Sequence, residues 1–209
     1  MSATPSDIVF SAAVKAVQSR RGSRDQMAAR GTGGGWPERI SADLAGFIGT
    51  ITTCYIATAS AGGQPTIQHR GGPPGFLVVV DDTTIAFADF AGNQQYVTTG
   101  NLTENSRICL FLIDCENRRR VKIWGHARTV DDDPALIARL TPAASRARVQ
   151  QAVIITVETF DVNCSQHIPQ KFDAADVAST IKTFQARVRE LDAENGELKA
   201  RIAALEHGA

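Results

Sequence analysis

The fold is decided by a stretch whose residues alternate in character, Asn117-Arg118-Arg119-Arg120-Val121-Lys122-Ile123-Trp124-Gly125-His126. Successive side chains of a β-strand point to opposite faces of a sheet. The alternation therefore places Val121 and Ile123 on one face and basic or aromatic side chains on the other, namely Arg120, Lys122, Trp124 and His126. This second face is interpreted either as a solvated outer surface or as a cationic wall for a ligand.

Further strand-like stretches precede and follow this one. They are rich in Val, Ile, Thr and Phe, and together with it they cover residues 52–59, 64–70, 76–81, 83–88, 106–113, 119–130 and 153–162. Gly-Gly, Asp-Asp or Asn-rich breaks separate them. Short strands at this spacing predict a small antiparallel barrel.

Helical patterns lie before and between the strands. Residues 6–20 have helical spacing, and the glycine-rich stretch 30–35 after them has the composition of a flexible connector. Ser41 is the expected cap of a short helix that leads into the barrel. Two more helices are expected, one near 93–104 and one that starts at Asp133-Pro134.

The C-terminal segment has a heptad pattern. Apolar residues and one asparagine follow one another in alternating steps of four and three: Val177, Ile181, Phe184, Val188, Leu191, Asn195, Leu198, Ile202 and Leu205. This spacing predicts the a and d positions of a coiled coil. Asn195 falls at an a position, where a buried asparagine favours a parallel two-stranded pair. The alternative is a single amphipathic helix folded back on its own barrel. The expected division is a helical arm with linker (1–35), a barrel (36–172) and a coiled-coil helix (173–209).

The composition excludes several classes of protein. The 209 residues contain 22 Lys and Arg and 22 Asp and Glu, so no net charge attracts nucleic acid or an anionic membrane. The apolar run 8–10 is too short for a signal peptide or a membrane span. A cytoplasmic protein with neither kind of partner is therefore expected. No C-x-x-C spacing joins the four cysteines, which are expected to be reduced and without metal: Cys54, Cys109, Cys115 and Cys164.

Two polar turns are candidates for holding an anion. The first ends a strand with an arginine and two glycines, which let another group approach the backbone: Gln68-His69-Arg70-Gly71-Gly72-Pro73-Pro74-Gly75-Phe76. The second opens a helix, whose first N–H groups suit a phosphate: Phe87-Ala88-Asp89-Phe90-Ala91-Gly92-Asn93-Gln94-Gln95-Tyr96. The first also fits a plain glycine-rich turn with a solvated arginine. The second also fits an ordinary connection between a strand and a helix.

The last strand runs into amide, imidazole and ammonium groups, in Asp161-Val162-Asn163-Cys164-Ser165-Gln166-His167-Ile168-Pro169-Gln170-Lys171. A cysteine close to a histidine suggests a nucleophile. No third residue that would orient the histidine is identifiable, so Cys164 is interpreted as a structural thiol. No residue is assigned as a catalytic acid or base.

These four segments, in this order, resemble those of the pyridoxamine 5′-phosphate oxidase-like family of FMN-binding split barrels. The resemblance covers about residues 10–172 and rests on Q-H-R-G-G-P-P-G-F, on D-F-x-G-N-x-Q-Y followed by G-N-L, on N-R-R-R-x-K-I-W-G and on N-C-x-Q-H-I-P. It implies a mainly β fold, an antiparallel split β-barrel of Greek-key type with flanking helices. It also implies a homodimer with FMN at its interface.

The resemblance also implies which residues bind FMN. Carried over by position, they are Gln68, His69, Arg70 and Gly71 at one strand end, Asp89, Asn93, Gln94, Gln95 and Tyr96 in the polar turn, Arg120 and Lys122 along the cavity, and Gln166 and His167 near the flavin. Pyridoxamine phosphate oxidases proper carry an Arg-Lys pair where this chain has Gln94 and Gln95. The loss of two cations weakens the hold on a phosphate dianion.

The leading functional hypothesis is an FMN-dependent oxidoreductase with a small-molecule substrate, in which the flavin performs the chemistry. The family's residues for a substrate phosphate have no match near the C-terminus, which argues against vitamin B6 oxidation. One alternative is a non-enzymatic flavin or haem binder or sensor, with His69, His126 or His167 as iron ligand. Another alternative is that the coiled coil is the main functional part, with the barrel as a docking module for partner proteins.

Overall fold

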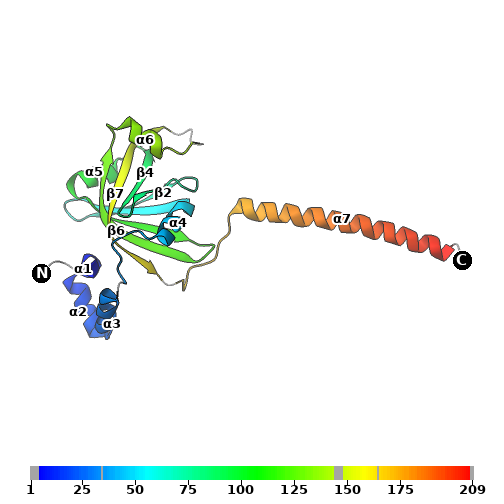
Figure 1. The fold of residues 1–209 in the computed structure, drawn as a ribbon, viewed down its shortest axis with the longest axis horizontal. Helices are drawn as coiled ribbons and strands as arrows, with labels where there is room; N and C mark the ends of the chain where they lie inside the picture. Colours follow the sequence, from blue (N-terminus) through cyan, green and yellow to red (C-terminus); the bar gives the residue numbers. More distant parts are fainter. Residues whose placement is uncertain (1–4, 34, 144–147, 164, 208–209) are drawn as a thin grey trace. The chain divides into compact units, whose positions relative to one another are not determined.

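The computed structural model describes residues 5–33, 35–143, 148–163 and 165–207. Contacts divide the chain into two units, Met1–Ile168 and Pro169–Ala209. The first unit is a β-barrel with helices packed around it, and the second holds one long helix (Figure 1).

Antiparallel strands form one seven-stranded sheet in the order β2-β1-β5-β6-β7-β4-β3. Their bounds are β1 (Thr53–Ala59), β2 (Pro65–Gly71), β3 (Val78–Asp81), β4 (Thr84–Phe90), β5 (Arg107–Asp114), β6 (Arg119–Val130) and β7 (Val149–Asn163). Every predicted strand is present, and the predicted fold class is confirmed. Strand β7 begins earlier than expected, because Val149 already pairs with Phe90 of β4.

The sheet curls until strands far apart in its order meet. Arg70 near the end of β2 forms an ion pair with Asp89 of β4, although β1, β5, β6 and β7 lie between these strands in the sheet. Side chains therefore close the barrel where the backbone ladder does not. We call the hydrogen-bonded residues at this closure the polar seam: Gln68, Arg70, Asp89, Thr98, Thr99 and Gln151.

The barrel core follows the alternation of the strands. On β6, Val121 and Ile123 are fully buried, whereas Lys122 between them is half-buried. Helix α4 (Ala42–Thr50) contributes apolar side chains to the same core. Its predicted cap is present, since the Ser41 hydroxyl accepts a hydrogen bond from the Leu44 N–H at 3.2 Å.

The two helices expected between strands are also present. Helix α5 (Val97–Glu104) begins a few residues later than expected, because Gln94 and Tyr96 have left-handed backbone conformations, with φ of 61° and 51°. Helix α6 (Pro134–Leu140) starts with its proline in the first turn. The Asp133 carboxylate caps α6 by accepting from the Leu136 N–H at 2.9 Å.

The N-terminal region differs from the single helix expected over residues 6–20. It contains α1 (Pro5–Val9), α2 (Ala12–Arg21) and α3 (Arg24–Thr32). The Ser11 hydroxyl caps α2, and Gly22 ends it with φ of 77°. Ser11 and Gly22 therefore divide into shorter helices a region that was expected to form one. Helix α3 extends into the stretch 30–35 that was expected to be a flexible connector.

Aromatic and ionic contacts anchor these N-terminal residues to the barrel. The ring of Trp36 lies 5.3 Å from that of Phe10 and 6.0 Å from that of Trp124 on β6. Arg30 forms an ion pair with Asp161 of β7 and also lies over the Trp36 ring. The N-terminal helices therefore belong to the same packed unit as the barrel.

The second unit contains α7 (Ala174–His207), a helix of 34 residues. The Asp173 carboxylate accepts a hydrogen bond from the Ala175 N–H at 2.8 Å, as expected of a capping residue. No α7 residue whose burial is described is buried. Among the described helices, none has both the length and the apolar character needed to span a membrane.

Candidate functional site

An open pocket of about 260 Å³ lies at the polar seam. Four parts of the chain line it: the end of β2 (Gln68, His69, Arg70, Gly71), the end of β4 and its turn (Asp89, Phe90, Ala91, Gly92, Asn93, Gln94), the start of α5 (Tyr96, Val97, Thr98, Thr99) and the start of β7 (Gln150, Gln151). The polar groups are mainly carboxamides and hydroxyls, with one guanidinium, one carboxylate and one imidazole. Such a lining suits a polar ligand with several hydrogen-bonding groups.

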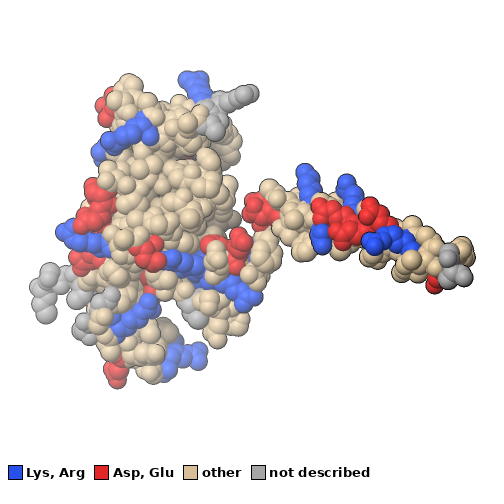
Figure 2. All heavy atoms as spheres, turned by 45° about the vertical axis from the view of Figure 1, so that its right-hand side comes forward, with Lys and Arg blue, Asp and Glu red and all other residues tan. Residues whose placement is uncertain are grey.

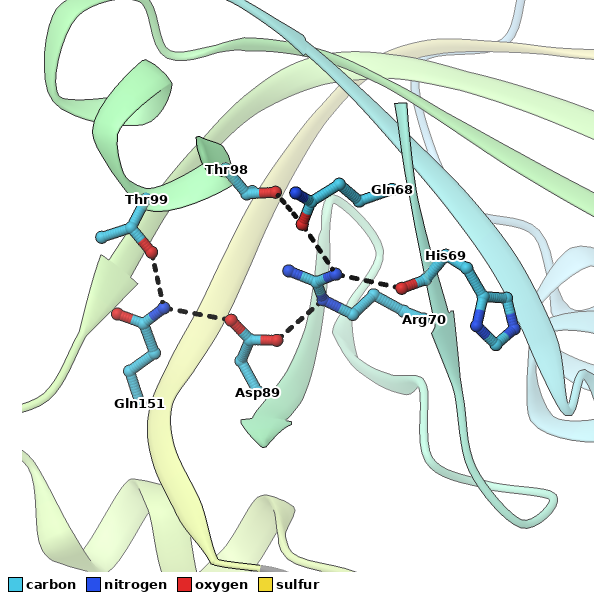
Figure 3. A network of polar contacts seen from close by, with 7 residues as sticks. All are labelled: Gln68, His69, Arg70, Asp89, Thr98, Thr99 and Gln151. Carbon is cyan, nitrogen blue, oxygen red and sulfur yellow. Dashed lines mark hydrogen bonds and ion pairs between the residues drawn. The ribbon is translucent and has the colours of Figure 1, made fainter. Parts of the chain in front are cut away.

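Arg70 is held from several sides (Figure 3). Its Nη1 donates to Gln68 Oε1 at 3.2 Å and to the His69 carbonyl oxygen at 3.0 Å. Its Nε lies 2.7 Å from Asp89 Oδ1, but this buried N–H is not aligned for a hydrogen bond. The side chains of Arg70 and Asp89 are only 20% and 12% exposed, so each charge is compensated mainly by the other.

Asp89 has a second partner on β7. The Gln151 Nε2 donates to Asp89 Oδ2 at 3.0 Å and to Thr99 Oγ1 at 2.9 Å. The Thr98 hydroxyl donates to Gln68 Oε1 at 3.0 Å, which links α5 to β2. The polar seam thus joins β2, β4, α5 and β7 in one network, and fixes the wall of the pocket.

The turn after β4 is backbone-strained, and it leaves donors at the pocket. Left-handed φ values at Gln94 and Tyr96 are uncommon for residues other than glycine. Tyr96 is the N-cap of α5, but its side chain makes no capping hydrogen bond. Its hydroxyl instead accepts from Gln150 Nε2 at 2.8 Å. The first N–H groups of α5 are therefore uncapped by a side chain, and they lie in a segment that lines the pocket.

Most of the predicted binding residues meet at this pocket: Gln68, His69, Arg70, Gly71, Asp89, Asn93, Gln94 and Tyr96. Gln95 is exposed on the same turn but does not line it. The pocket of the single chain also does not include Arg120, Lys122, Gln166 or His167. The role of all these residues in binding, inside and outside the pocket, remains a prediction.

Four lining residues with polar side chains were not predicted from the sequence: Thr98, Thr99, Gln150 and Gln151. Gln151 is a buried amide that reaches the site because its strand pairs with β4, opposite Asp89. It lies before the stretch expected to be the last strand. The pair Gln150-Gln151 ahead of an apolar run is the one signal that could have indicated it.

The predicted basic and aromatic face of β6 is half-buried rather than simply solvated. The Trp36 ring covers part of it next to Trp124. His126 Nδ1 lies 2.8 Å from the Ser106 hydroxyl, and its Nε2 lies 3.4 Å from Glu158. Arg120 Nε and Asn163 Oδ1, which sit opposite one another in the β6–β7 register, are buried without a hydrogen-bond partner among the described residues. This end of the face therefore has unsatisfied hydrogen-bonding capacity.

The described cysteines are free thiols. Cys54 lies in the core of β1 opposite Arg70, and burial raises its pKa to about 12, although the Arg70 charge opposes this rise. Burial also raises the pKa of Cys109. Cys164 lies outside the described residues. Within those residues, no cluster of three or more His, Cys, Asp or Glu side chains could hold a metal ion.

Alkylation of the native protein at pH 8 is expected to modify Cys115 while leaving Cys54 unmodified. A thiolate is the reactive form, and the raised pKa keeps the Cys54 thiol protonated at that pH. Iodoacetamide labelling followed by peptide mass spectrometry measures the modified fraction at each site. Protein unfolded in guanidinium is the control, in which both cysteines should react. Modification of Cys54 in the native state at the rate of Cys115 would contradict its placement in the core.

Comparisons with known proteins relate the chain to one family. A family model described as pyridoxamine 5′-phosphate oxidase matches residues 40–164. No curated protein matches. Similar solved structures include HupZ of Group A Streptococcus, with 19% identity, a TM-score of 0.49 and coverage of 64% of this chain and 99% of that one. Another is an FMN-binding protein from Syntrophomonas wolfei subsp. wolfei, with 12% identity, a TM-score of 0.44 and coverage of 71% and 97%.

Proposed function

The chain belongs to the pyridoxamine 5′-phosphate oxidase family, and from that premise we propose that it binds flavin mononucleotide and acts as an oxidoreductase on a small-molecule substrate. One observation carries the proposal: two motifs distant in sequence, Gln68–Gly71 and Asp89–Tyr96, meet at one pocket. FMN would supply the electron or hydride transfer when bound. The chain's own residues would bind and orient it.

The donor set of the pocket fits the ribityl chain of FMN. Each ribityl hydroxyl both donates and accepts hydrogen bonds, and so do carboxamides and protein hydroxyls. All four walls of the pocket offer these groups, which include the side chains of Gln68, Asn93 and Gln150. We assign these side chains to the ribityl chain.

The described residues that line the pocket include one cationic side chain that could hold the FMN phosphate, Arg70. Arg70 and the first N–H groups of α5 are the donors available to it. Asp89 already compensates the Arg70 charge, and Gln94 supplies an amide where a cation would strengthen the contact. The site therefore fits FMN, with a phosphate contact weaker than one made by several free cations.

A homodimer with the flavin between two copies is part of the proposal. The pocket of one chain is smaller than the roughly 300–1,000 Å³ common for ligand sites, and it is open. Arg120, Lys122, Gln166 and His167 lie outside it. A second copy would let these residues approach a flavin bound to the first. Arg120 Nε and Asn163 Oδ1, which have no hydrogen-bond partner among the described residues, support an external partner at this face.

An absorbance spectrum of the freshly purified protein tests the cofactor. Flavin bands are expected, a Soret band would indicate haem instead, and absence of both would contradict a tightly bound cofactor. Reconstitution with FMN, followed by fluorescence titration, then measures binding directly. Anaerobic titration with NADH and NADPH tests the oxidoreductase role separately, because a flavin carrier would bind FMN without being reduced at a useful rate.

Gln94→Lys is expected to tighten FMN binding by about tenfold while leaving riboflavin affinity unchanged, since an ionised donor adds about 1.4 kcal/mol over an amide. Riboflavin lacks the phosphate, so the ratio of the two dissociation constants isolates the phosphate contact. Gln95→Lys is the matched control, because it adds the same charge to the same turn outside the pocket. Equal gains in FMN affinity for both variants would remove Gln94 from the phosphate site.

A further inference from the structure

Helix α7 carries an apolar stripe that nothing in the described chain covers. Its members are between 41% and 75% exposed: Val177, Ile181, Phe184, Val188, Leu191, Leu198, Ile202 and Leu205. Together with Asn195 they lie at alternating steps of four and three, so they form one continuous line along the helix. A continuous exposed apolar surface of this kind marks an interaction site.

The residue types along the stripe identify its partner. In a heptad, the a positions hold Ile181, Val188, Asn195 and Ile202, and the d positions hold Val177, Phe184, Leu191, Leu198 and Leu205. β-branched residues at a with leucine at d favour two parallel strands over larger assemblies. We propose that α7 pairs with α7 of a second copy of this chain in a parallel, in-register, two-stranded coiled coil over residues 177–205.

Charged residues beside the stripe complement one another in this arrangement. In a parallel pair, each g position faces the e position five residues further along the other helix. Those pairs are Arg187 with Asp192, Glu194 with Lys199, and Arg201 with Glu206. All of them attract. Figure 2 shows acidic and basic side chains intermixed along α7.

The opposite orientation brings like charges together. Reversing one helix places g positions beside g positions and e positions beside e positions. The g residues Arg187, Glu194 and Arg201 then read positive, negative, positive from either end. In the antiparallel alignment that places Glu194 opposite Glu194 of the other helix, Arg187 meets Arg201 and Asp192 meets Asp192, so like charges face one another. Repulsion of this kind selects against that alignment.

Asn195 sets the register of the parallel pair. Its Nδ2 donates to the Leu191 carbonyl oxygen at 3.0 Å within its own helix, and its side chain lies on the apolar stripe. A single asparagine at an a position is satisfied only when it meets the asparagine of the other helix. Any shift by a heptad would place this amide against an apolar residue, which specifies the in-register alignment.

Disulfide cross-linking of the full chain tests the proposal. Ile202→Cys places a thiol at an a position near the helix end, where only a parallel in-register pair brings two copies within bonding distance. Ala200→Cys is the matched control at an outward-facing position of the same turn. Under mild oxidation, Ile202→Cys is expected to form a covalent dimer about tenfold faster than Ala200→Cys, measured on non-reducing gels against the wild-type chain with its native cysteines. Equal rates, or no cross-link, would overturn the parallel pair.

A second variant guards against misfolding of the cysteine variants. Asn195→Leu removes the polar pair, so thermal unfolding of α7, followed by circular dichroism at 222 nm, is expected at higher temperature. Light scattering is expected to give a dimer or a larger assembly, because the residue that limits the pair to two strands is gone. A monomeric wild-type chain, or a leucine variant unchanged in both mass and unfolding temperature, would overturn the proposal. These readouts need no flavin, so they are independent of the proposed function.

Discussion

Arg70→Ala is expected to lower the free energy of unfolding by about 3 kcal/mol, the lower end of the cost of breaking a buried ion pair. In the intact protein the Asp89 side chain is only 12% exposed, and the substitution leaves Gln151 as its hydrogen-bond donor among the described residues. It also removes the link between β2 and β4 at the barrel closure. Urea unfolding of the apoprotein measures the change, and Arg128→Ala on exposed β6 surface is the control, expected to change stability by less than about 0.5 kcal/mol.

The same substitution also tests the role of Arg70 in FMN binding, apart from its effect on stability. At a temperature where both variants are folded, Arg70→Ala is expected to weaken FMN binding by about ten- to a hundredfold relative to Arg128→Ala. The double variant Arg70→Ala with Asp89→Ala should be more stable than Arg70→Ala alone, since it no longer buries an uncompensated charge. If Arg70→Ala and Arg128→Ala unfold at the same urea concentration, the polar seam does not hold the barrel together.

The polar seam contains both features that the sequence predicts and features that it does not. Arg70 and Asp89 lie in two motifs with local signatures, a strand end and a polar turn, and the family resemblance implies both as binding residues. Their ion pair was not predicted, since it forms only when the sheet curls and joins strands that do not pair. Gln151 depends in the same way on the β4–β7 register. Motifs and the family resemblance thus identify Arg70 and Asp89, whereas their mutual compensation is a property of barrel closure.

The glycines after Arg70 give a second example. Both were expected to let another group approach the backbone. Gly71 lines the pocket, but an added Cβ there would lie 3.1 Å from the Thr52 carbonyl oxygen and 3.1 Å from the His69 ring. At Gly72, an added Cβ would lie 2.6 Å from the Phe76 Cβ, so at both glycines the groups that approach are the chain's own. A glycine-rich motif predicts a close approach without revealing whether a ligand or the protein makes it.

The β6–β7 pairing contains a similar close approach at Gly125. The register shifts between Trp124, which pairs with Thr159, and Gly125, which pairs with Val157. Glu158 is therefore left without a partner in the ladder, and its carboxylate lies near His126. A Cβ on Gly125 would lie 2.0 Å from the Thr156 carbonyl oxygen. The glycine is needed because the obstacle is backbone, which cannot rotate away.

Gly125→Ala is accordingly expected to destabilise the protein by about 3 kcal/mol, the upper end of the usual cost of overpacking. The two longest strands of the barrel would have to separate locally, and the outer face that carries Arg120 and Lys122 would shift with them. Gly46→Ala in α4 is the matched control, because an added Cβ there meets nothing within 4 Å. That variant should gain about 0.5–1 kcal/mol, since alanine favours a helix over glycine. Urea unfolding of both variants beside the wild-type chain measures the two changes, which should have opposite signs. A Gly125→Ala protein as stable as wild type would show that β6 and β7 do not approach as closely as this register requires.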